Sequence, residues 1–489
     1  MWCLSVLSLS LSRSLPVWYK VFSKKLQVRV RESNSMERAE VTAFLSLIFI
    51  LLVTFIGGIM ESASVQMAKN YRRADVNRAI ESVFAEYQKE LLEHYDIFSL
   101  DGTYESGKYS ESLVERRLGY FGAAHMENTI QRIQFLTDNG AEAFYEQVMH
   151  YMENKYGLNH LKDKFSMTDT WKAQEEKADR YEKESHEKED ELNGLLGEAG
   201  GELPSQDNPI AHVSQLKKKS LLDLIMPGGR TVSGKKINLD NSLLKRKKNK
   251  GYGNFSDVAD GSSPWSSLVL GEYLLGHFSM ATDEETKGAL DYELEYICAG
   301  KASDRENLEA VAKRLILIRF ASNYLFLQNS PSKQAEAEAL ALTLCTLAAL
   351  PALCQAAAQV ILLAWAFGES VVDLRALLNG SRVPFTKTEA NWQLSLAGLM
   401  KLGESGDISD GKDSKEGLYY KEYLRILLFL EKKEKIGMRA LDMIEQNLQK
   451  VYGAEFFKAD CCISRVEIKS SVKLRRGITY QFQTYYGYN

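Results

Sequence analysis

The sequence is poor in residues that mark several classes of protein. Of its 489 residues only 8 are proline and 6 are cysteine, and no Cys-x-x-Cys pair occurs. So few prolines argue against long disordered tracts, and the cysteine spacing indicates neither a zinc site nor a disulfide scaffold. Neither sign of charge dominates, because 61 basic and 65 acidic residues give a net charge of −4. Nucleic-acid-binding domains are usually basic, so nucleic acid is not an expected partner.

Motifs of common enzyme classes are also missing. The sequence has no His-Glu-x-x-His, Gly-x-Ser-x-Gly, P-loop or Gly-x-Gly-x-x-Gly motif. The signatures of zincins, α/β-hydrolases, P-loop NTPases and dinucleotide-binding folds are therefore absent. Ser330 and Lys333 match Ser-x-x-Lys by letters, but the motifs that accompany it in penicillin-binding enzymes do not occur. We expect no catalysis, no cofactor and no metal site.

One long uncharged run stands near the start of the sequence. Residues 41–60 read VTAFLSLIFILLVTFIGGIM, and a helix of that length rises about 30 Å, the thickness of the bilayer hydrocarbon. The run predicts a transmembrane helix, which includes Val41, Leu45, Leu51, Gly57, Gly58 and Met60. The two adjacent glycines would allow the close approach of a partner helix.

The charges on either side of this run predict its orientation. Basic residues precede it, among them Lys24, Lys25, Arg29, Arg31 and Arg38. The positive-inside rule therefore places residues 1–40 in the cytoplasm and the rest of the chain outside, although three basic residues that follow the run reduce the asymmetry. We expect Met36 to be the natural start and residues 1–35 a misassigned extension. A secretory signal peptide is the competing interpretation.

The polypeptide after the span divides into four predicted parts. Apolar residues continue at helical spacing, which predicts a stalk helix over residues 61–102. Residues 103–196 are expected to form a first part of the outer domain, with a long charged helix. Residues 197–264, rich in Gly, Ser, Asn and Lys, are predicted to be a flexible basic excursion, and residues 265–489 complete the domain.

Strand-like patterns are few along the chain and stand among many helical ones. Four stretches are typical of strands: residues 126–136, 291–298, 463–474 and 478–486. They predict a predominantly helical α+β fold in which helices cover a small antiparallel sheet.

A second apolar run covers residues 339–368, which contain no charged residue. Its length would suffice to cross a membrane, but alanine dominates it and Pro351 divides it. We favour a buried helical hairpin, and a second transmembrane span is the alternative.

Several blocks of the sequence resemble a known family. Residues 36–102, from MERAEVTAFLS to HYDIFSLDG, resemble the start of a domain-of-unknown-function family of Gram-positive bacteria. That family is similar to the TadE/TadG-like membrane proteins of Tad (Flp-type) pilus and type II secretion loci. Later blocks, QRIQFLTDNGAEAFYEQVMHYM and LAWAFGESVVDLRALLNGSRVPFTKTEANWQLSL among them, resemble it as well. The resemblance implies an anchored pilus or secretion component that binds other components, and it assigns no catalytic residue.

One helical face carries a candidate polar cluster. Trp365, Glu369 and Asp373 are spaced four residues apart, so they share a face. Arg375 or Arg382 is the expected partner of the two acids. The cluster either orients a binding surface or is an ion-pair network where a buried helix reaches the surface, and we favour the network.

A basic run, LLKRKKNKG over residues 243–251, is the second candidate site. It would bind an anionic partner such as a wall polymer or lipid head groups, or else it is a solvated loop. Nucleic acid ranks last as its partner, because no aromatic pattern supports base stacking.

These patterns together predict a single-pass membrane protein whose C-terminal domain lies outside the cytoplasm. Its expected role is that of a non-catalytic component of a Tad-like pilus or secretion assembly. The expected partners are membrane lipid, other components of the assembly and an anionic wall polymer. The alternatives are a cell-surface enzyme, such as a carboxylate-dependent wall hydrolase, and an adhesive ectodomain.

Overall fold

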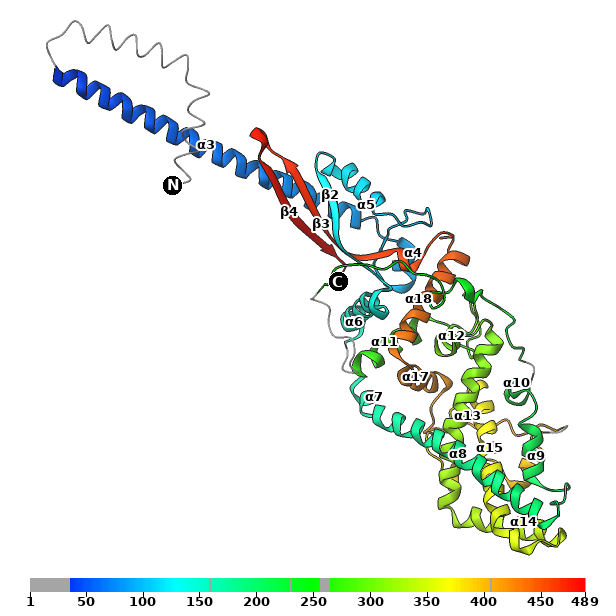
Figure 1. The fold of residues 1–489 in the computed structure, drawn as a ribbon. Helices are drawn as coiled ribbons and strands as arrows, with labels where there is room; N and C mark the ends of the chain where they lie inside the picture. Colours follow the sequence, from blue (N-terminus) through cyan, green and yellow to red (C-terminus); the bar gives the residue numbers. More distant parts are fainter. Residues whose placement is uncertain (1–35, 158–160, 229, 256–263, 405–406, 489) are drawn as a thin grey trace. The chain divides into compact units, whose positions relative to one another are not determined.

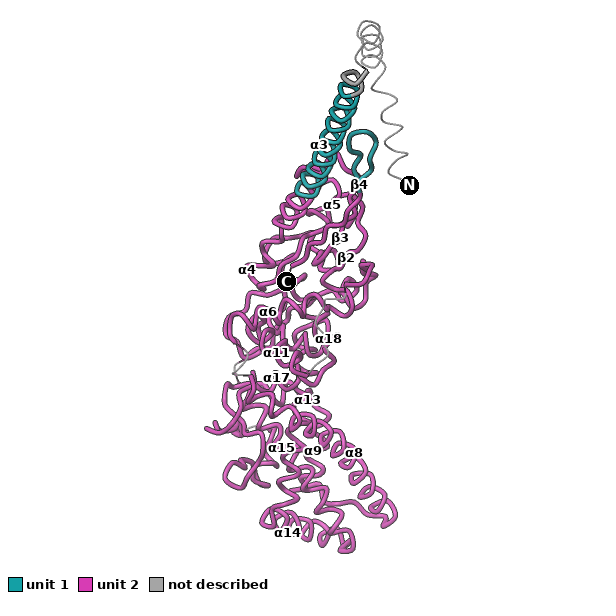
Figure 2. Tube along the Cα trace, turned by 90° about the vertical axis from the view of Figure 1, so that its left-hand side faces the viewer, with its two compact units in different colours: residues 1–75, 471–480 teal, residues 76–470, 481–489 magenta. Residues whose placement is uncertain are grey.

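A computed structural model describes residues 36–157, 161–228, 230–255, 264–404 and 407–488 of the chain. The chain forms two compact units (Figure 2), of which one comprises residues 1–75 and 471–480 and the other residues 76–470 and 481–489. Most described residues are helical, and a small four-stranded sheet accompanies the helices (Figure 1). The predicted fold class, a predominantly helical α+β fold with an N-terminal apolar helix, is confirmed.

The apolar run lies in one long helix, α3 (Met36–Phe84). Its side chains are turned outward: Val41, Leu45, Leu51 and Met60 are 58%, 59%, 63% and 68% exposed. No atom lies within 4 Å of the Cβ position that Gly57 or Gly58 would have. Among the described residues, α3 is the one helix long and apolar enough to cross a membrane. An apolar surface of this size must be covered by lipid or by another apolar partner.

The predicted stalk helix over residues 61–102 is too long. Helix α3 ends at Phe84, and a short helix, α4 (Lys89–Tyr95), and a strand, β1 (Leu100–Asp101), follow. The break is stabilised by backbone pairing, because Gln88 donates its N–H to the carbonyl of Ser99 and Tyr87 pairs with Leu100. Helical spacing alone does not reveal this return of the chain, since no proline or glycine marks it.

The sheet is built around the strand β3 (Cys462–Lys473), which pairs with β1, β2 (Glu127–Phe135) and β4 (Thr479–Gly487). Strands β1 and β3 are antiparallel, with Leu100 opposite Ile463. A tight turn at Arg475–Gly477 joins β3 to β4, with positive φ at Arg476 (60°) and Gly477 (75°). Three of the four strands predicted from the sequence are therefore present.

The fourth predicted strand, residues 291–298, is wrong. These residues contribute to a helix, α12 (Glu293–Ala299), all of whose residues from Glu293 to Cys298 are buried. Because acidic and apolar residues alternate in this stretch, the sequence predicted a strand with one solvent-exposed face. Both acids are instead inside the protein, where Glu293 accepts a hydrogen bond from the N–H of Ser279 (2.9 Å) and Glu295 one from the N–H of Ala281 (2.9 Å).

The helical body is centred on α15 (Cys354–Leu378), most of whose residues are buried. The helices packed on it are α8 (Thr168–Ala199), α9 (Pro209–Leu216), α10 (Leu221–Ile225), α13 (Asp304–Asn329) and α14 (Pro331–Leu347). The remaining helices are α5 (Glu111–Leu118), α6 (Glu142–Tyr156), α7 (Lys162–Ser166), α11 (Pro264–His277), α16 (Leu396–Leu399), α17 (Tyr420–Leu430) and α18 (Lys433–Lys450).

The second apolar run forms a helical hairpin. Helix α14 ends at Leu347, a single 3-10 turn begins at Pro351, and α15 starts at Cys354. Helix α15 is enclosed by its neighbours, which agrees with the predicted buried hairpin. Helix α14 is less enclosed, because Leu342 and Leu347 are exposed.

The described part of residues 197–264 differs from the predicted flexible excursion. It contains helices α9 and α10, and Val213, Leu216 and Leu222 are buried in the core. The stretches PIAHVSQL and LLDLI are apolar enough to form two short amphipathic helices. The average composition of residues 197–264 hides both of them.

Candidate functional site

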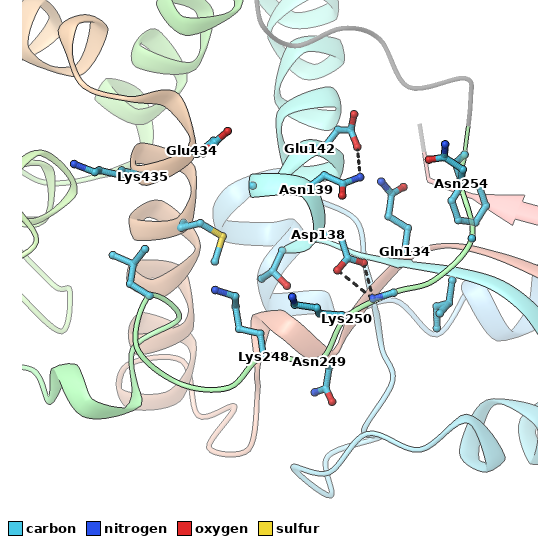
Figure 3. A pocket seen from close by; sticks show the side chains of 18 residues that line it. Gln134, Asp138, Asn139, Glu142, Lys248, Asn249, Lys250, Asn254, Glu434 and Lys435 are labelled. Carbon is cyan, nitrogen blue, oxygen red and sulfur yellow. Dashed lines mark hydrogen bonds between the residues drawn. The ribbon is translucent and has the colours of Figure 1, made fainter.

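A polar pocket of about 510 Å³ lies where the basic run meets the end of β2 and the start of α18. The turn before α6 forms one wall, residues 244–255 form another, and Glu434, Lys435 and Met438 of α18 contribute a third (Figure 3). The basic run that the sequence singled out therefore lines a cavity, together with residues more than a hundred positions away in each direction.

Hydrogen bonds to Asp138 fix the basic run against the sheet. The Asp138 carboxylate accepts the N–H of Phe135 (2.7 Å) and the N–H of Gly251 (3.0 and 3.1 Å to its two oxygens). Tyr252 pairs with Ile133 through two backbone hydrogen bonds of 3.0 Å. A Cβ at Gly251 would collide with the carbonyl oxygen of Ile133 and with the Asp138 carboxylate, so only glycine permits this close approach. Burial raises the pKa of Asp138, although its backbone hydrogen bonds and Lys250 oppose that effect.

One cation of the basic run is an internal anchor. Arg246 pairs with Glu445 and Asp460, which are 2% and 4% exposed, and the Asp460 carboxylate also accepts the backbone N–H of Asn249 (3.0 Å). Lys248 donates to the carbonyl of Leu243 (2.9 Å). The exposed cations are Lys245, Lys247 and Lys250. Part of the run therefore stabilises the fold, and fewer of its cations are exposed than the sequence KRKKNK suggests.

Two buried polar groups at the pocket have no hydrogen-bond partner among the described residues. They are the carboxamide oxygen of Gln134 and the hydroxyl of Thr137, and both residues are 4% exposed. A buried polar atom without a partner costs about 1–3 kcal/mol. Both residues line the pocket, so a bound polar molecule could satisfy them.

The charged lining of the pocket is balanced, with three lysines and three carboxylates: Lys248, Lys250, Lys435, Asp138, Glu142 and Glu434. Amide side chains are also frequent, and Asn139 donates to Glu142 (2.9 Å). Such a lining favours hydrogen bonding to a polar ligand over the attraction of a highly charged one.

The polar cluster predicted on α15 is a fully buried ion-pair network. Lys387 binds Glu369 and lies 2.8 Å from an Asp373 oxygen, and the Arg319 Nε lies 3.0 Å from the other Asp373 oxygen. All four charged groups are 0% exposed. Asn323 donates to Asp373 (3.1 Å), and the N–H of Leu394 donates to Glu369 (2.7 Å).

The predicted partners of the two acids are wrong. Arg375 binds Asp407 (2.7 Å) and the carbonyl of Leu224 (2.7 Å), and Arg382 binds Asp413 (2.6 Å). The i, i+4 spacing puts Trp365, Glu369 and Asp373 on one face as predicted, but that face points into the core, where Trp365 donates to the carbonyl of Leu394 (2.8 Å). Lys387 and Arg319 reach the acids from other segments, so local spacing could not identify them.

The two acids of the network differ electrostatically. Burial raises the pKa of Glu369, and Lys387 only partly offsets it. Burial would also raise the pKa of Asp373, but Lys387 and Arg319 outweigh it and hold this pKa below its usual value. With every charge paired and none exposed, the network joins α13, α15 and the loop at Lys387. It serves the fold and does not present a surface for a ligand.

Among the described residues, no group of three or more His, Cys, Asp or Glu side chains is placed to hold a metal ion. The five described cysteines, at 298, 345, 354, 461 and 462, are free thiols.

Comparison with known protein families gives a match. A model described as a family of unknown function, DUF5702, matches residues 199–474, more than half of the chain. The matched region includes the basic run, α18 and the buried ion-pair network, whereas the apolar helix α3 and the turn at Asp138 lie outside it. No curated protein and no solved structure matches the chain.

Proposed function

The chain belongs to the DUF5702 family of unknown function, and we propose that it is a membrane-anchored, non-catalytic binding component of an extracytoplasmic assembly. The observation that carries the proposal is the outward-facing apolar surface of α3, whose most apolar stretch has no buried residue. A bilayer covers such a surface around its whole circumference, as a helix of this length and composition requires.

The proposed orientation has the N-terminus in the cytoplasm and the folded domain outside. It rests on the basic residues before the span, among them Lys24, Lys25, Arg29, Arg31 and Arg38, of which Arg38 alone follows Met36. The free thiols agree with either side of a membrane and do not bear on the orientation.

The proposed assembly is a Tad-like pilus or secretion system. Support comes from the resemblance of residues 36–102 to the start of a TadE/TadG-like family of Gram-positive bacteria. In this proposal the lipid-embedded helix holds the domain at the membrane, and Gly57 and Gly58 leave room for a partner helix.

The polar pocket is the proposed binding site for a component or wall polymer outside the membrane. Its unsatisfied groups at Gln134 and Thr137 favour a ligand rich in hydrogen-bonding groups. The exposed Lys245, Lys247 and Lys250 favour an anionic segment beside it.

Deletion and fractionation test this proposal together. The chain should remain with the membranes after alkaline carbonate washing, and deletion of its gene should abolish assembly of the surface pilus or secretion complex. A Lys247→Gln/Lys250→Gln variant should still reach the membrane but retain less purified wall polymer than a Lys401→Gln/Lys415→Gln variant, which removes two exposed charges elsewhere. Recovery of the intact chain in the soluble fraction, or normal assembly without the gene, would refute the proposal.

A carboxylate-dependent wall hydrolase is the second candidate. One observation favours it, namely that Glu142 and Glu434 line the same pocket as Asp138. Paired carboxylates are what glycoside hydrolysis requires. Release of sugar fragments from purified wall by the chain, and its loss in Glu142→Gln or Glu434→Gln variants, would support this candidate over the first.

A further inference from the structure

The turn between β3 and β4 belongs to the same compact unit as the apolar helix. This unit contains residues 471–480 together with α3 up to Asp75, and Figure 2 shows the turn beside the helix. The sequence predicted the two strands that this turn joins. Its position along the helix gives it a further role.

Two contacts fix that position. Arg476 forms a salt bridge with Glu61, and the Lys69 ammonium lies 5.3 Å from the centre of the Tyr480 ring. Glu61 directly follows Met60, the last residue of the apolar run. With a helical rise of 1.5 Å per residue, Lys69 is about 12 Å further along the axis than Glu61. The turn thus meets the helix where its apolar surface ends.

The turn is strongly basic at this level. Residues 471–480 contain Lys473, Arg475 and Arg476 and no acidic residue, and all three cations are exposed. The Arg476 side chain keeps 72% of its surface exposed even with its salt bridge to Glu61. Ile478, which is 40% exposed, adds an apolar side chain to the same turn.

We infer that this turn binds the anionic head groups of the bilayer that holds α3. The inference rests on the proposed function, since it requires α3 to be in lipid. The head-group layer begins where the hydrocarbon ends and extends several ångströms beyond it. Arginine side chains at the level of Glu61 therefore reach lipid phosphates, which the guanidinium group binds through two parallel hydrogen bonds. Ile478 suits the inner edge of the same layer, where the head groups meet the acyl chains.

The interaction gives the chain a second contact with the membrane. Each basic residue near an anionic membrane surface changes lipid binding roughly fivefold. Because the attraction acts over about a Debye length, it should weaken as salt rises. The turn would thereby be held on the membrane surface next to the helix.

Fluorescence quenching tests the inference on the full chain in vesicles. A fluorophore is attached to Ile478→Cys in a background with Cys3→Ala and Cys354→Ala, because the four remaining cysteines are buried. The quencher is a phospholipid with a spin-labelled head group. The vesicles contain phosphatidylcholine alone or phosphatidylcholine mixed with phosphatidylglycerol. We expect stronger quenching in the anionic vesicles and a smaller difference at high salt.

Matched variants separate lipid binding from docking to the helix. Lys473→Gln/Arg475→Gln removes two cations that make no contact with Glu61, and it should weaken binding of the turn to anionic lipid up to about 30-fold. Glu61→Gln breaks the salt bridge but keeps all three cations, so quenching in anionic vesicles should stay the same or rise. The control Lys401→Gln/Lys415→Gln removes the same charge from the other unit and should have no effect.

Each outcome decides a different claim. A chain that does not float with phosphatidylcholine vesicles would refute the anchoring by α3, and this inference with it. A chain that floats, but whose turn is quenched equally in both lipids and in all variants, would refute only the binding of the turn to anionic head groups. Lipid-dependent quenching that Lys473→Gln/Arg475→Gln removes supports both.

Discussion

At the scale of the residue, the most consequential side chains are the four buried charges of Arg319, Glu369, Asp373 and Lys387. Removing charges from water is expensive, and the protein recovers this energy only through close pairing and additional hydrogen bonds. The network has both, since Asn323 and the N–H of Leu394 bind the acids as well. Its stability therefore depends on each member being present.

Substitution of Lys387 should show this dependence. Lys387→Met would leave Glu369 buried without its cation and Asp373 with Arg319 alone, so we expect a loss of about 3–5 kcal/mol in the free energy of unfolding. Urea denaturation of the full chain in detergent micelles, followed by circular dichroism, measures it. The exposed control Lys401→Met should change the free energy by less than about 0.5 kcal/mol. Equal effects of the two substitutions would contradict the account of the network.

Glu295 should make the stability depend on pH. It is 0% exposed, and burial raises its pKa from 4.5 to about 7 despite hydrogen bonds from Ala281 and Tyr420. Below about pH 4.5 the carboxyl is protonated in both the folded and the unfolded state. Between about pH 4.5 and 7 the unfolded state loses the proton first, so stability falls by up to about 3 kcal/mol as pH rises.

Comparison of Glu295→Gln with the unsubstituted chain isolates this contribution. The amide cannot ionise, so the variant should lose less stability between pH 5 and pH 7.5 than the unsubstituted chain, as urea midpoints would show. Glu338→Gln, at an exposed position, should leave the pH dependence unchanged. A pH dependence that survives in Glu295→Gln would assign it to other groups.

At the scale of the element, the sequence predicted three of the four strands and the long apolar helix, whose apolar patterns are pronounced. Strands β2, β3 and β4 were predicted from their apolar patterns. Apart from the missed helices α9 and α10, which the average composition of residues 197–264 hid, the errors come from long-range pairing. The end of α3 at Phe84 depends on the bond from Gln88 to Ser99, and α12 was missed because Glu293 and Glu295 are buried. Likewise Lys387 and Arg319 could not be assigned to Asp373, since contacts 14 and 54 residues apart leave no local pattern.

The end of α14 offers a test of local backbone strain. Ala349 has φ = 58°, and Leu350 and Ala349 donate to the carbonyls of Cys345 and Thr346, which is the pattern of a Schellman motif. Glycine adopts this conformation without strain, so Ala349→Gly should raise the free energy of unfolding by about 1 kcal/mol. Ala348→Gly, at φ = −78°, should lower it by up to about 1 kcal/mol. A loss of stability in both variants, measured by urea denaturation, would contradict the assignment of strain to Ala349.

At the scale of the whole molecule, the sequence predicted an apolar helix followed by a mainly helical α+β domain, and the structure has both. The pocket was half predicted, because the basic run was recognised but not the turn at Asp138 or the start of α18 that complete it. Those segments are distant in sequence, and the groups that favour a ligand there, Gln134 and Thr137, carry no motif.

The proposed placement of the domain outside the cytoplasm can be tested by labelling with a membrane-impermeant maleimide. The chain would carry Cys3→Ala and Cys354→Ala together with a new cysteine at Ile408, which is 89% exposed, or at Glu37, before the span. Background labelling should be small, since burial raises the pKa of Cys298 and of Cys461 to about 12. In intact protoplasts we predict labelling at position 408 and none at position 37 until the membrane is permeabilised. Labelling at 37 but not at 408, or at neither in intact protoplasts and at both after lysis, would contradict a domain held outside the cytoplasm by α3.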